Sequence, residues 1–240
     1  MTLPVTVSPV TARQELSLLW RRGDAVPIMV GMTTLEARTR RRPPLLTAGL
    51  AAAPIWILLA VVQAATRTGF DLTRHPVSML SLGELGWIQI SSFVVTGVLT
   101  LCGAAGLYAT GAGGVWGPRL LGVQGAGLIV AGLFPADPGF AFPPGTPDVP
   151  GTMSAAGAVH LAAASASFLA MIAFCFILSR RFGGSSWAVA GRAGGALLAA
   201  GLCWAMSGAA GGPLAMFAGV VAAWAWITVT MAKLERAAQG

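Results

Sequence analysis

Four polar side chains recur at every third position of one segment: His75, Ser78, Ser81 and Glu84. On a helix this spacing places them on one broad polar face, while the intervening leucines occupy the other side. The pattern predicts a short amphipathic helix lying at an apolar interface. Asp71 and Arg74 immediately precede the segment and add two charges of opposite sign.

Two further ionisable residues stand beside or inside apolar runs. Asp137 follows the run that ends at Phe134, and His160 lies within the next one. If that run begins as a helix near Ser154, His160 lies about 9 Å along its axis. An ionisable group at such a depth is a functional candidate. The alternative is a neutral imidazole that is hydrogen-bonded to a neighbouring helix.

The residue types suit a metal as well as a binding pocket. His75, Glu84, Asp137 and His160 are adequate ligands for zinc or a similar divalent ion, and such an ion would activate water for hydrolysis. The spacing matches no H-E-x-x-H motif, so no cofactor is assigned from it. The competing interpretation is an Asp–His–Arg network that holds helices together. A G-x-S-x-G nucleophile turn is lacking too.

The composition shows what surrounds these residues. The chain has 240 residues, of which 55% are hydrophobic and 10% are charged, whereas soluble domains carry about 25% charged residues. Too few charges remain to cover a water-facing surface, so lipid is the expected partner. The net charge of +7 comes from arginine clusters between apolar runs and not from a basic stripe, which argues against nucleic acid.

Six apolar runs are long enough, at about 20 residues each, to cross a bilayer as helices. The expected fold is an all-α integral membrane protein with a bundle of six transmembrane helices. The runs cover residues 46–65, 87–108, 119–134, 154–178, 187–207 and 213–232. Gln124 is the main strongly polar residue in the middle of a run, and this scarcity argues against an ion-coupled transporter.

Arginine and lysine set the expected orientation, because cytoplasmic loops are rich in both. With six spans, most of these residues fall on the side of the two termini, and only Arg67 and Arg74 fall on the other. Both termini are therefore expected in the cytoplasm of a cell-membrane protein. The predicted parts are a disordered tail (1–44), the membrane domain (45–232) and a short C-terminal tail (233–240). Met29 and Met32 are alternative start positions.

Two other features leave alternatives open. Residues 135–152 carry six prolines, which preclude a regular helix, and this loop is either a lid over a cavity or a plain connection. Small residues four apart, such as Gly122/Ala126 and Gly191/Gly195, allow helices to approach closely in lipid. They fit a tight bundle, and they also allow a homo-oligomer.

Three motifs resemble a known family. They are H-P-V-S-M-L-S-L-G after Arg74, G-L-F-P-A-D at the end of the third run, and a histidine in the outer part of the fourth. Together they resemble the domain-of-unknown-function family 998 of bacterial and archaeal multi-pass membrane proteins, over about residues 45–232. The matching positions are Ser78, Ser81, Asp137 and His160. The resemblance implies six spans and no established activity.

Three functions follow as hypotheses. The first is an outward-facing polar pocket for a lipid-like or small amphipathic ligand, centred on Asp137 and His160. Its mouth is formed by Asp71, Arg74, His75, Ser78, Ser81 and Glu84. The second is a membrane-embedded, metal-assisted hydrolase or lipid-modifying enzyme that uses the same groups. The third is a structural or accessory subunit in which these residues only hold the bundle together.

Overall fold

The computed structural model describes residues 44–239. The predicted tail of residues 1–44 lies outside this part of the chain, except for Pro44, where the first described helix begins. Residues from Arg41 onward belong to one compact unit.

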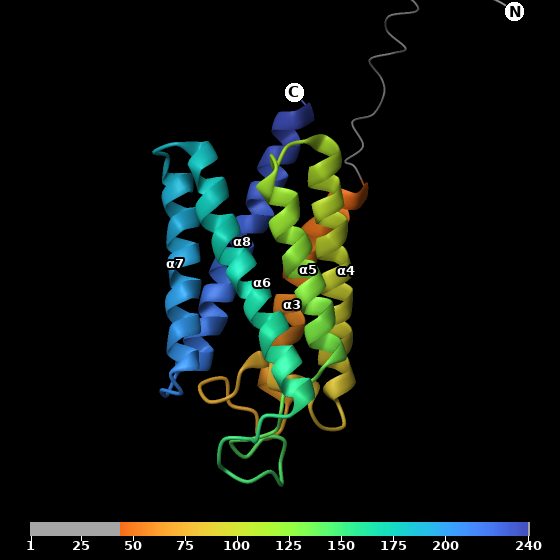
Figure 1. Ribbon diagram of the computed structural model, residues 1–240, viewed down its shortest axis with the longest axis vertical. Helices are drawn as coiled ribbons and strands as arrows, with labels where there is room; N and C mark the ends of the chain where they lie inside the picture. Colours follow the sequence, from red (N-terminus) through yellow and green to blue (C-terminus); the bar gives the residue numbers. More distant parts are fainter. Residues whose placement is uncertain (1–43, 240) are drawn as a thin grey trace, which may run out of the picture. The chain divides into compact units, whose positions relative to one another are not determined.

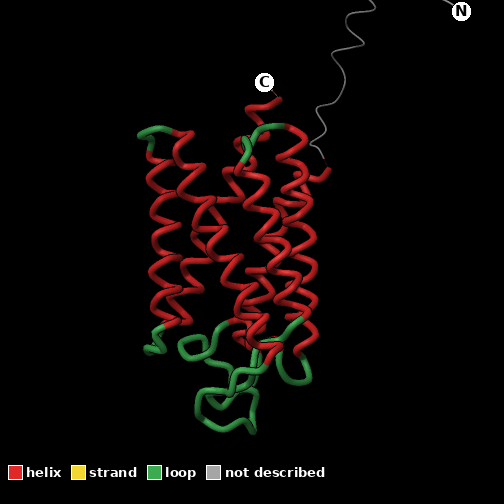
Figure 2. The backbone as a smooth tube through the Cα atoms, viewed as in Figure 1, coloured by secondary structure: helices red, strands yellow, loops and turns green. Residues whose placement is uncertain are grey.

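Each of the six apolar runs is a helix, and the described part of the chain contains two short 3₁₀ turns and no strand (Figures 1 and 2). The α-helices are α3 (Pro44–Thr66), α4 (Gly86–Thr110), α5 (Trp116–Leu133), α6 (Ala155–Ser179), α7 (Ser186–Met206) and α8 (Gly212–Gln239). The 3₁₀ turns are η1 (Val77–Ser81) and η2 (Arg180–Phe182). Because α8 continues to Gln239, most of the predicted C-terminal tail of residues 233–240 is helical.

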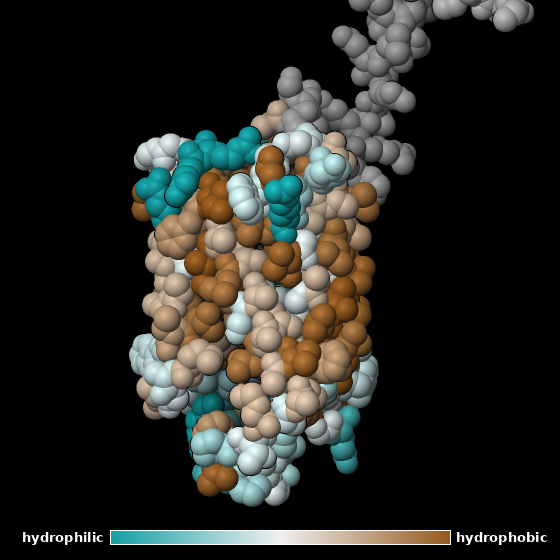
Figure 3. Space-filling view, in the orientation of Figure 1, coloured by the Kyte–Doolittle hydropathy of each residue, from teal (hydrophilic) through white to brown (hydrophobic). Residues whose placement is uncertain are grey.

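Five of the helices, α3, α4, α6, α7 and α8, are long and apolar enough to cross a membrane. The remaining one, α5, has 18 residues and carries Arg119 in its first turn. Apolar residues cover the band between the two ends of the bundle, and hydrophilic ones gather at the ends (Figure 3). The chain is therefore an all-α, multi-pass membrane protein.

Glycines bring neighbouring helices together, as their frequency in the runs predicts. A Cβ atom on Gly103 of α4 would lie 3.0 Å from the Cα of Gly49 in α3, and one on Gly125 of α5 would lie 2.8 Å from the carbonyl oxygen of Gly97. These backbones touch directly, which leaves no room for a side chain. In the same way α7 packs along α8, where Gly201 abuts Ala215.

The bundle has two unlike ends. The start of α3 and the end of α8 lie at one of them (Figure 1). We call the other the loop end, because residues 67–85, 134–154 and 207–211 lie there (Figure 2). Near the turn that joins them, α6 and α7 are in contact at Cys175 and Gly195. They separate toward the loop end (Figure 1), and this separation matters for the site.

Candidate functional site

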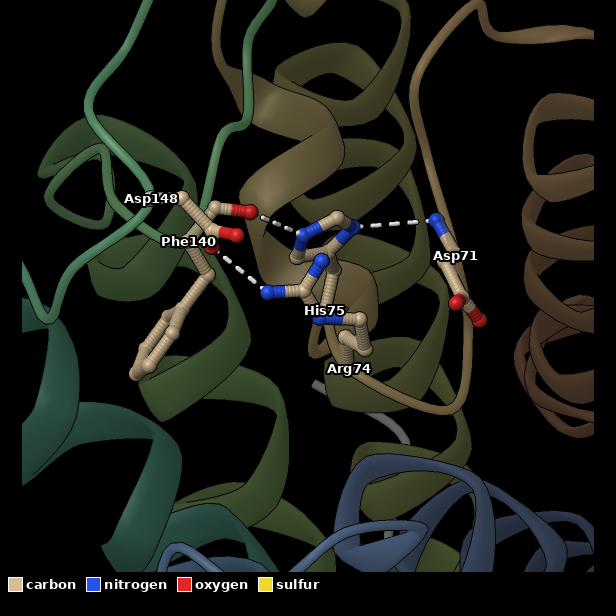
Figure 4. Close-up of polar contacts among 5 residues, drawn as sticks. All are labelled: Asp71, Arg74, His75, Phe140 and Asp148. Carbon is tan, nitrogen blue, oxygen red and sulfur yellow. Dashed lines mark hydrogen bonds and ion pairs between the residues drawn. The ribbon is translucent and has the colours of Figure 1, made fainter.

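His75 joins the two long loops at the loop end. The backbone N–H of Asp71 donates a hydrogen bond to its Nδ1 at 2.9 Å, and its Nε2 lies 2.8 Å from the carbonyl oxygen of Phe140 (Figure 4). A carbonyl can only accept, so Nε2 carries the proton and Nδ1 does not. Both ring nitrogens are thus engaged, one with each loop.

Aromatic rings enclose this histidine. The His75 side chain is 2% exposed, and its ring centroid lies 5.5 Å from that of Phe70 and 5.4 Å from that of Phe142. Phe142 is fully buried, and the guanidinium of Arg67 lies over its ring at 5.6 Å. The proline-rich loop is therefore packed onto the first loop and is more than a plain connection.

The charged residues beside His75 lie on the surface. Arg74 donates to a carboxylate oxygen of Asp148 at 2.6 Å (Figure 4), and both side chains are about half exposed. Asp71 accepts hydrogen bonds from the side-chain hydroxyl and the backbone N–H of Thr73, and these bonds lower the pKa of its carboxyl. Arg74 and His75 therefore form a clasp between the two loops, and Asp71 holds the turn of the first loop.

The predicted amphipathic helix over residues 75–84 is corrected by the structure. Only the five residues of η1 are helical, and His75 and Ser81 on the supposed polar face are buried. Ser81 donates to the carbonyl oxygen of Ser78 at 2.7 Å, while Glu84 is exposed. The segment is held between the helices and the proline-rich loop instead of lying on a lipid surface.

Asp137 helps to cap helix α6, whose N-cap residue is Ser154. The backbone N–H of Ser154 donates to its carboxylate at 2.9 Å, and a Cβ atom on Gly157 would collide with the same carboxylate. The positive end of the helix dipole favours a carboxylate there. Hydrogen bonds from the side chain and then from the backbone of Ser154 lower the pKa of the Asp137 carboxyl.

His160 is fixed by the end of α5. Its Nδ1 lies 2.8 Å from the carbonyl oxygens of both Ala131 and Phe134. Since both partners are acceptors, Nδ1 carries the proton, and Nε2 of the neutral ring is left as an acceptor. The side chain is 5% exposed. No described residue bonds to Nε2 in the structure, so this nitrogen is available to a ligand.

His160 borders a cavity of about 160 Å³ inside the bundle. Residues of all six helices and of η1 line it, and it extends from η1 at the loop end to half the height of the helices. Most of the wall is aliphatic, aromatic or methionine. The lining residues with polar side-chain atoms are Trp56, Ser78, Gln124, His160, Ser165, Ser167 and Trp224.

Of the eight predicted pocket residues, only Ser78 and His160 line this cavity. Asp137 does not share it, because its carboxylate is committed to the start of α6. The four metal-ligand candidates do not gather either: within residues 44–239 no three His, Cys, Asp or Glu side chains form a group that could hold a metal ion. In His75 both nitrogens already have partners.

The structure adds two residues that the sequence did not single out as a site. Gln124 is 1% exposed and Trp56 is 5% exposed, and both line the cavity. The sequence did offer one signal for Gln124, because it is a strongly polar residue in the middle of an apolar run. Trp56 lies among apolar residues at mid-helix, where only the packing of its neighbours distinguishes it from an ordinary core tryptophan.

We predict that His75→Ala loosens the proline-rich loop far more than Arg74→Ala. The first change removes two hydrogen bonds and a buried ring, which costs about 2–4 kcal/mol. The second removes an exposed ion pair, which contributes about 1 kcal/mol or less. Chymotrypsin cleavage after Phe140, which is followed by Ala141, measures the difference. Equal cleavage rates for the two variants would contradict the role given to His75.

We also predict a pH-dependent effect of Asp137→Asn. The folded pKa of Asp137 lies below the ordinary value of 3.8, so its stabilisation is present above that value and is lost as the pH falls through the folded pKa. At pH 7 the variant loses the negative charge beside the positive end of the helix dipole and should be destabilised by about 0.3–1 kcal/mol. Thermal unfolding at pH 7 and pH 3 tests this, with exposed Glu84→Gln as the control. A difference that persists unchanged at pH 3 would contradict the cap.

Comparison with known proteins identifies a family. The chain matches no curated protein and no solved structure at a significant level. One family model, described as protein of unknown function (DUF998), matches residues 50–233, which include all six helices in whole or in large part. The chain therefore belongs to this family of proteins of unknown function, DUF998.

Proposed function

We propose that this protein binds a small amphipathic or lipid-like ligand in the cavity inside its helix bundle. The observation that carries the proposal is the character of the wall. Ligand sites are mostly apolar with a few placed polar groups, and this cavity combines Trp224, Phe93 and Met171 with the polar atoms of Gln124 and His160.

The cavity is open toward lipid between α6 and α7. Leu161 of α6 and Met206 of α7 both line it, and they are 36% and 61% exposed. Both lie toward the loop end, where the two helices separate (Figure 1). A ligand dissolved in the bilayer therefore has a lateral route that does not pass through the clasped loops.

The volume of the cavity limits which part of a ligand the cavity can hold. An engineered apolar cavity of about 150 Å³ binds benzene, so about 160 Å³ accommodates a ring, a small head group or a short stretch of chain. The remainder of a longer molecule would lie between α6 and α7, in contact with lipid. We expect the polar group of the ligand inside the bundle and its apolar part toward the opening.

The two alternative functions have less support. A metal-assisted hydrolase would need ligands that come together, and His75 and Asp137 are each committed to the backbone of the loops. A purely structural subunit would need no cavity. A stoichiometric metal in the purified protein would favour the enzyme, and failure to bind any amphipathic probe would favour the structural role.

We further propose six spans with both termini in the cytoplasm of a cell-membrane protein. The position of α5, packed against α4 and α6, supports a sixth crossing despite its short length. The start of α3 and the end of α8 share one end of the bundle (Figure 1). That end also carries Arg119, Arg180 and Lys233, as expected for a cytoplasmic side.

Cysteine labelling tests this topology. In a variant without the three native cysteines, Asp148→Cys should react with a membrane-impermeant maleimide added to intact cells, because it lies at the loop end. Arg236→Cys should react only after the membrane is made permeable. The reverse pattern would overturn the orientation, and labelling of both sites in intact cells would overturn the even number of spans.

Filling the cavity tests the binding function. The probe is 6-bromohexan-1-ol, whose bromine should quench the cavity tryptophans Trp56 and Trp224 in a saturable way. Ala164→Phe places a ring in the cavity wall and should abolish the saturable quenching. Ala166→Phe is the matched control, since this residue is exposed on the same helix outside the cavity. Equal quenching in both variants would contradict the proposal.

A further inference from the structure

The interior of the bundle contains an unusual group of polar atoms. In the described part of the chain, seven buried side-chain nitrogen or oxygen atoms have no hydrogen-bond partner. All of them belong to α3, α4 and α5. They are Trp56 Nε1, Gln63 Oε1, Gln89 Nε2, Ser92 Oγ, Thr96 Oγ1, and Nε2 and Oε1 of Gln124.

The antiparallel packing of α3 and α4 places part of this group at one level, that is, at the same height along the helix axes. The side chain of Gln63 donates to that of Gln89 at 2.7 Å near the loop end, and Gly49 abuts Gly103 near the other end. These two pairs show that the helices run antiparallel without a change of register. Trp56, seven residues before Gln63, therefore lies level with Thr96, seven residues after Gln89.

Gln124 belongs to the same level. Gly125, the next residue of α5, touches Gly97, the residue after Thr96. The level is close to the midpoint of each helix, since α3, α4 and α5 run over residues 44–66, 86–110 and 116–133. An indole N–H, a hydroxyl and a whole carboxamide thus lie without partners at one level half-way through the bundle, and the indole and the carboxamide belong to residues that line the cavity.

A position in hydrocarbon makes this arrangement costly. Lipid offers no hydrogen bonds, so each unpartnered polar atom destabilises the folded protein unless something else bonds to it. Nearby hydroxyls do find partners: Ser167 donates to the backbone carbonyl oxygen of Gln124, and Thr100 donates to that of Thr96. Three of the seven unpartnered atoms, Trp56 Nε1 and the two polar atoms of the Gln124 side chain, belong to residues that line the cavity.

We propose that this level is a subsite for an uncharged polar group that both donates and accepts hydrogen bonds, with a hydroxyl as the simplest case. The inference rests on the binding function proposed above and specifies the ligand. Trp56 Nε1 requires an acceptor, and the carboxamide of Gln124 offers one donor group and one acceptor. No Asp, Glu, Lys or Arg lines the cavity, so a charged group would lack a counter-ion.

His160 lies apart from the central subsite. It lines the same cavity but lies nearer to the loop end, because it is in the second turn of α6. A ligand with a second donor would reach it from the central subsite. The ligand class is thus a membrane-soluble alcohol, such as a hydroxylated hydrocarbon chain or ring, that enters between α6 and α7.

The test compares two probes that differ in one hydroxyl, 6-bromohexan-1-ol and 1-bromohexane. Thermal unfolding of the full chain in detergent is followed by maleimide labelling of Cys175, which is fully buried, in a Cys102→Ser, Cys203→Ser background. A ligand that binds only the folded state raises the unfolding temperature in proportion to its affinity. We expect wild-type protein to bind the alcohol more tightly than the bromoalkane.

Gln124→Leu should then weaken alcohol binding by about threefold to tenfold, the range for one or two neutral hydrogen bonds, and leave bromohexane binding unchanged. Without any probe, this variant should unfold at a higher temperature, because it removes buried polar atoms that have no partner. A purely structural glutamine would give the opposite shift. If Gln124→Leu does not fold, Trp56→Phe provides the second test, because it removes the indole N–H donor and keeps an aromatic ring; it should weaken binding of the alcohol more than binding of the bromoalkane.

The outcomes separate the two proposals. The subsite is overturned if wild-type protein binds both probes equally, or if both variants bind the alcohol as tightly as wild type does. In that case only water forms hydrogen bonds with these polar atoms, and the cavity still binds a ligand. If neither probe binds wild-type protein, the binding function itself is overturned together with the subsite.

Discussion

Hydrocarbon offers no hydrogen bonds, and this constraint governs the arrangement of every polar group in the bundle. Backbone groups satisfy it by forming helices. Most buried side chains satisfy it by bonding to a backbone carbonyl, as Ser167 does on Gln124 and His160 does on Ala131. The groups that do not satisfy it, with Gln124 and Trp56 at the cavity wall, are the ones that point to a ligand.

The two histidines show how hydrogen bonding assigns different roles to the same residue type. In His75 both nitrogens bond to loop backbone, so the ring has no free acceptor and acts as a structural link. In His160 one nitrogen serves two carbonyl groups, and the other is left as an acceptor in a residue that lines the cavity. The hydrogen-bond partners of the two histidines, and not their positions in the sequence, place His75 in the clasp and His160 at the candidate site.

The clasp at the loop end and the gap between α6 and α7 are complementary features. The buried Phe142 and His75 hold the two loops together over the end of the bundle. The exposed side chains of Leu161 and Met206 border the cavity from the side. This arrangement is consistent with the proposed binding of a ligand that is itself dissolved in the membrane.

Much of the fold could be predicted from the sequence, because apolar runs of helical length have few alternatives in lipid. The six runs correspond to the six helices, and the proline-rich loop contains no helix, as its prolines require. Family membership followed from the short motifs around Ser78, Asp137 and His160, and the match over residues 50–233 confirmed it. Such properties depend on local composition, which is why the sequence alone determined them.

The site depended on tertiary structure, because a side chain's role is set by partners that are distant in sequence. Asp137 is level with the first turn of α6 and helps to cap it, so it does not join His160 in a pocket. Spacing of three suggested a surface helix around Ser78 and Ser81, but the proline-rich loop and the helices cover that segment. Gln124 and Trp56 become candidates only when the antiparallel register of three helices places them at one level without partners, and no local pattern encodes that register.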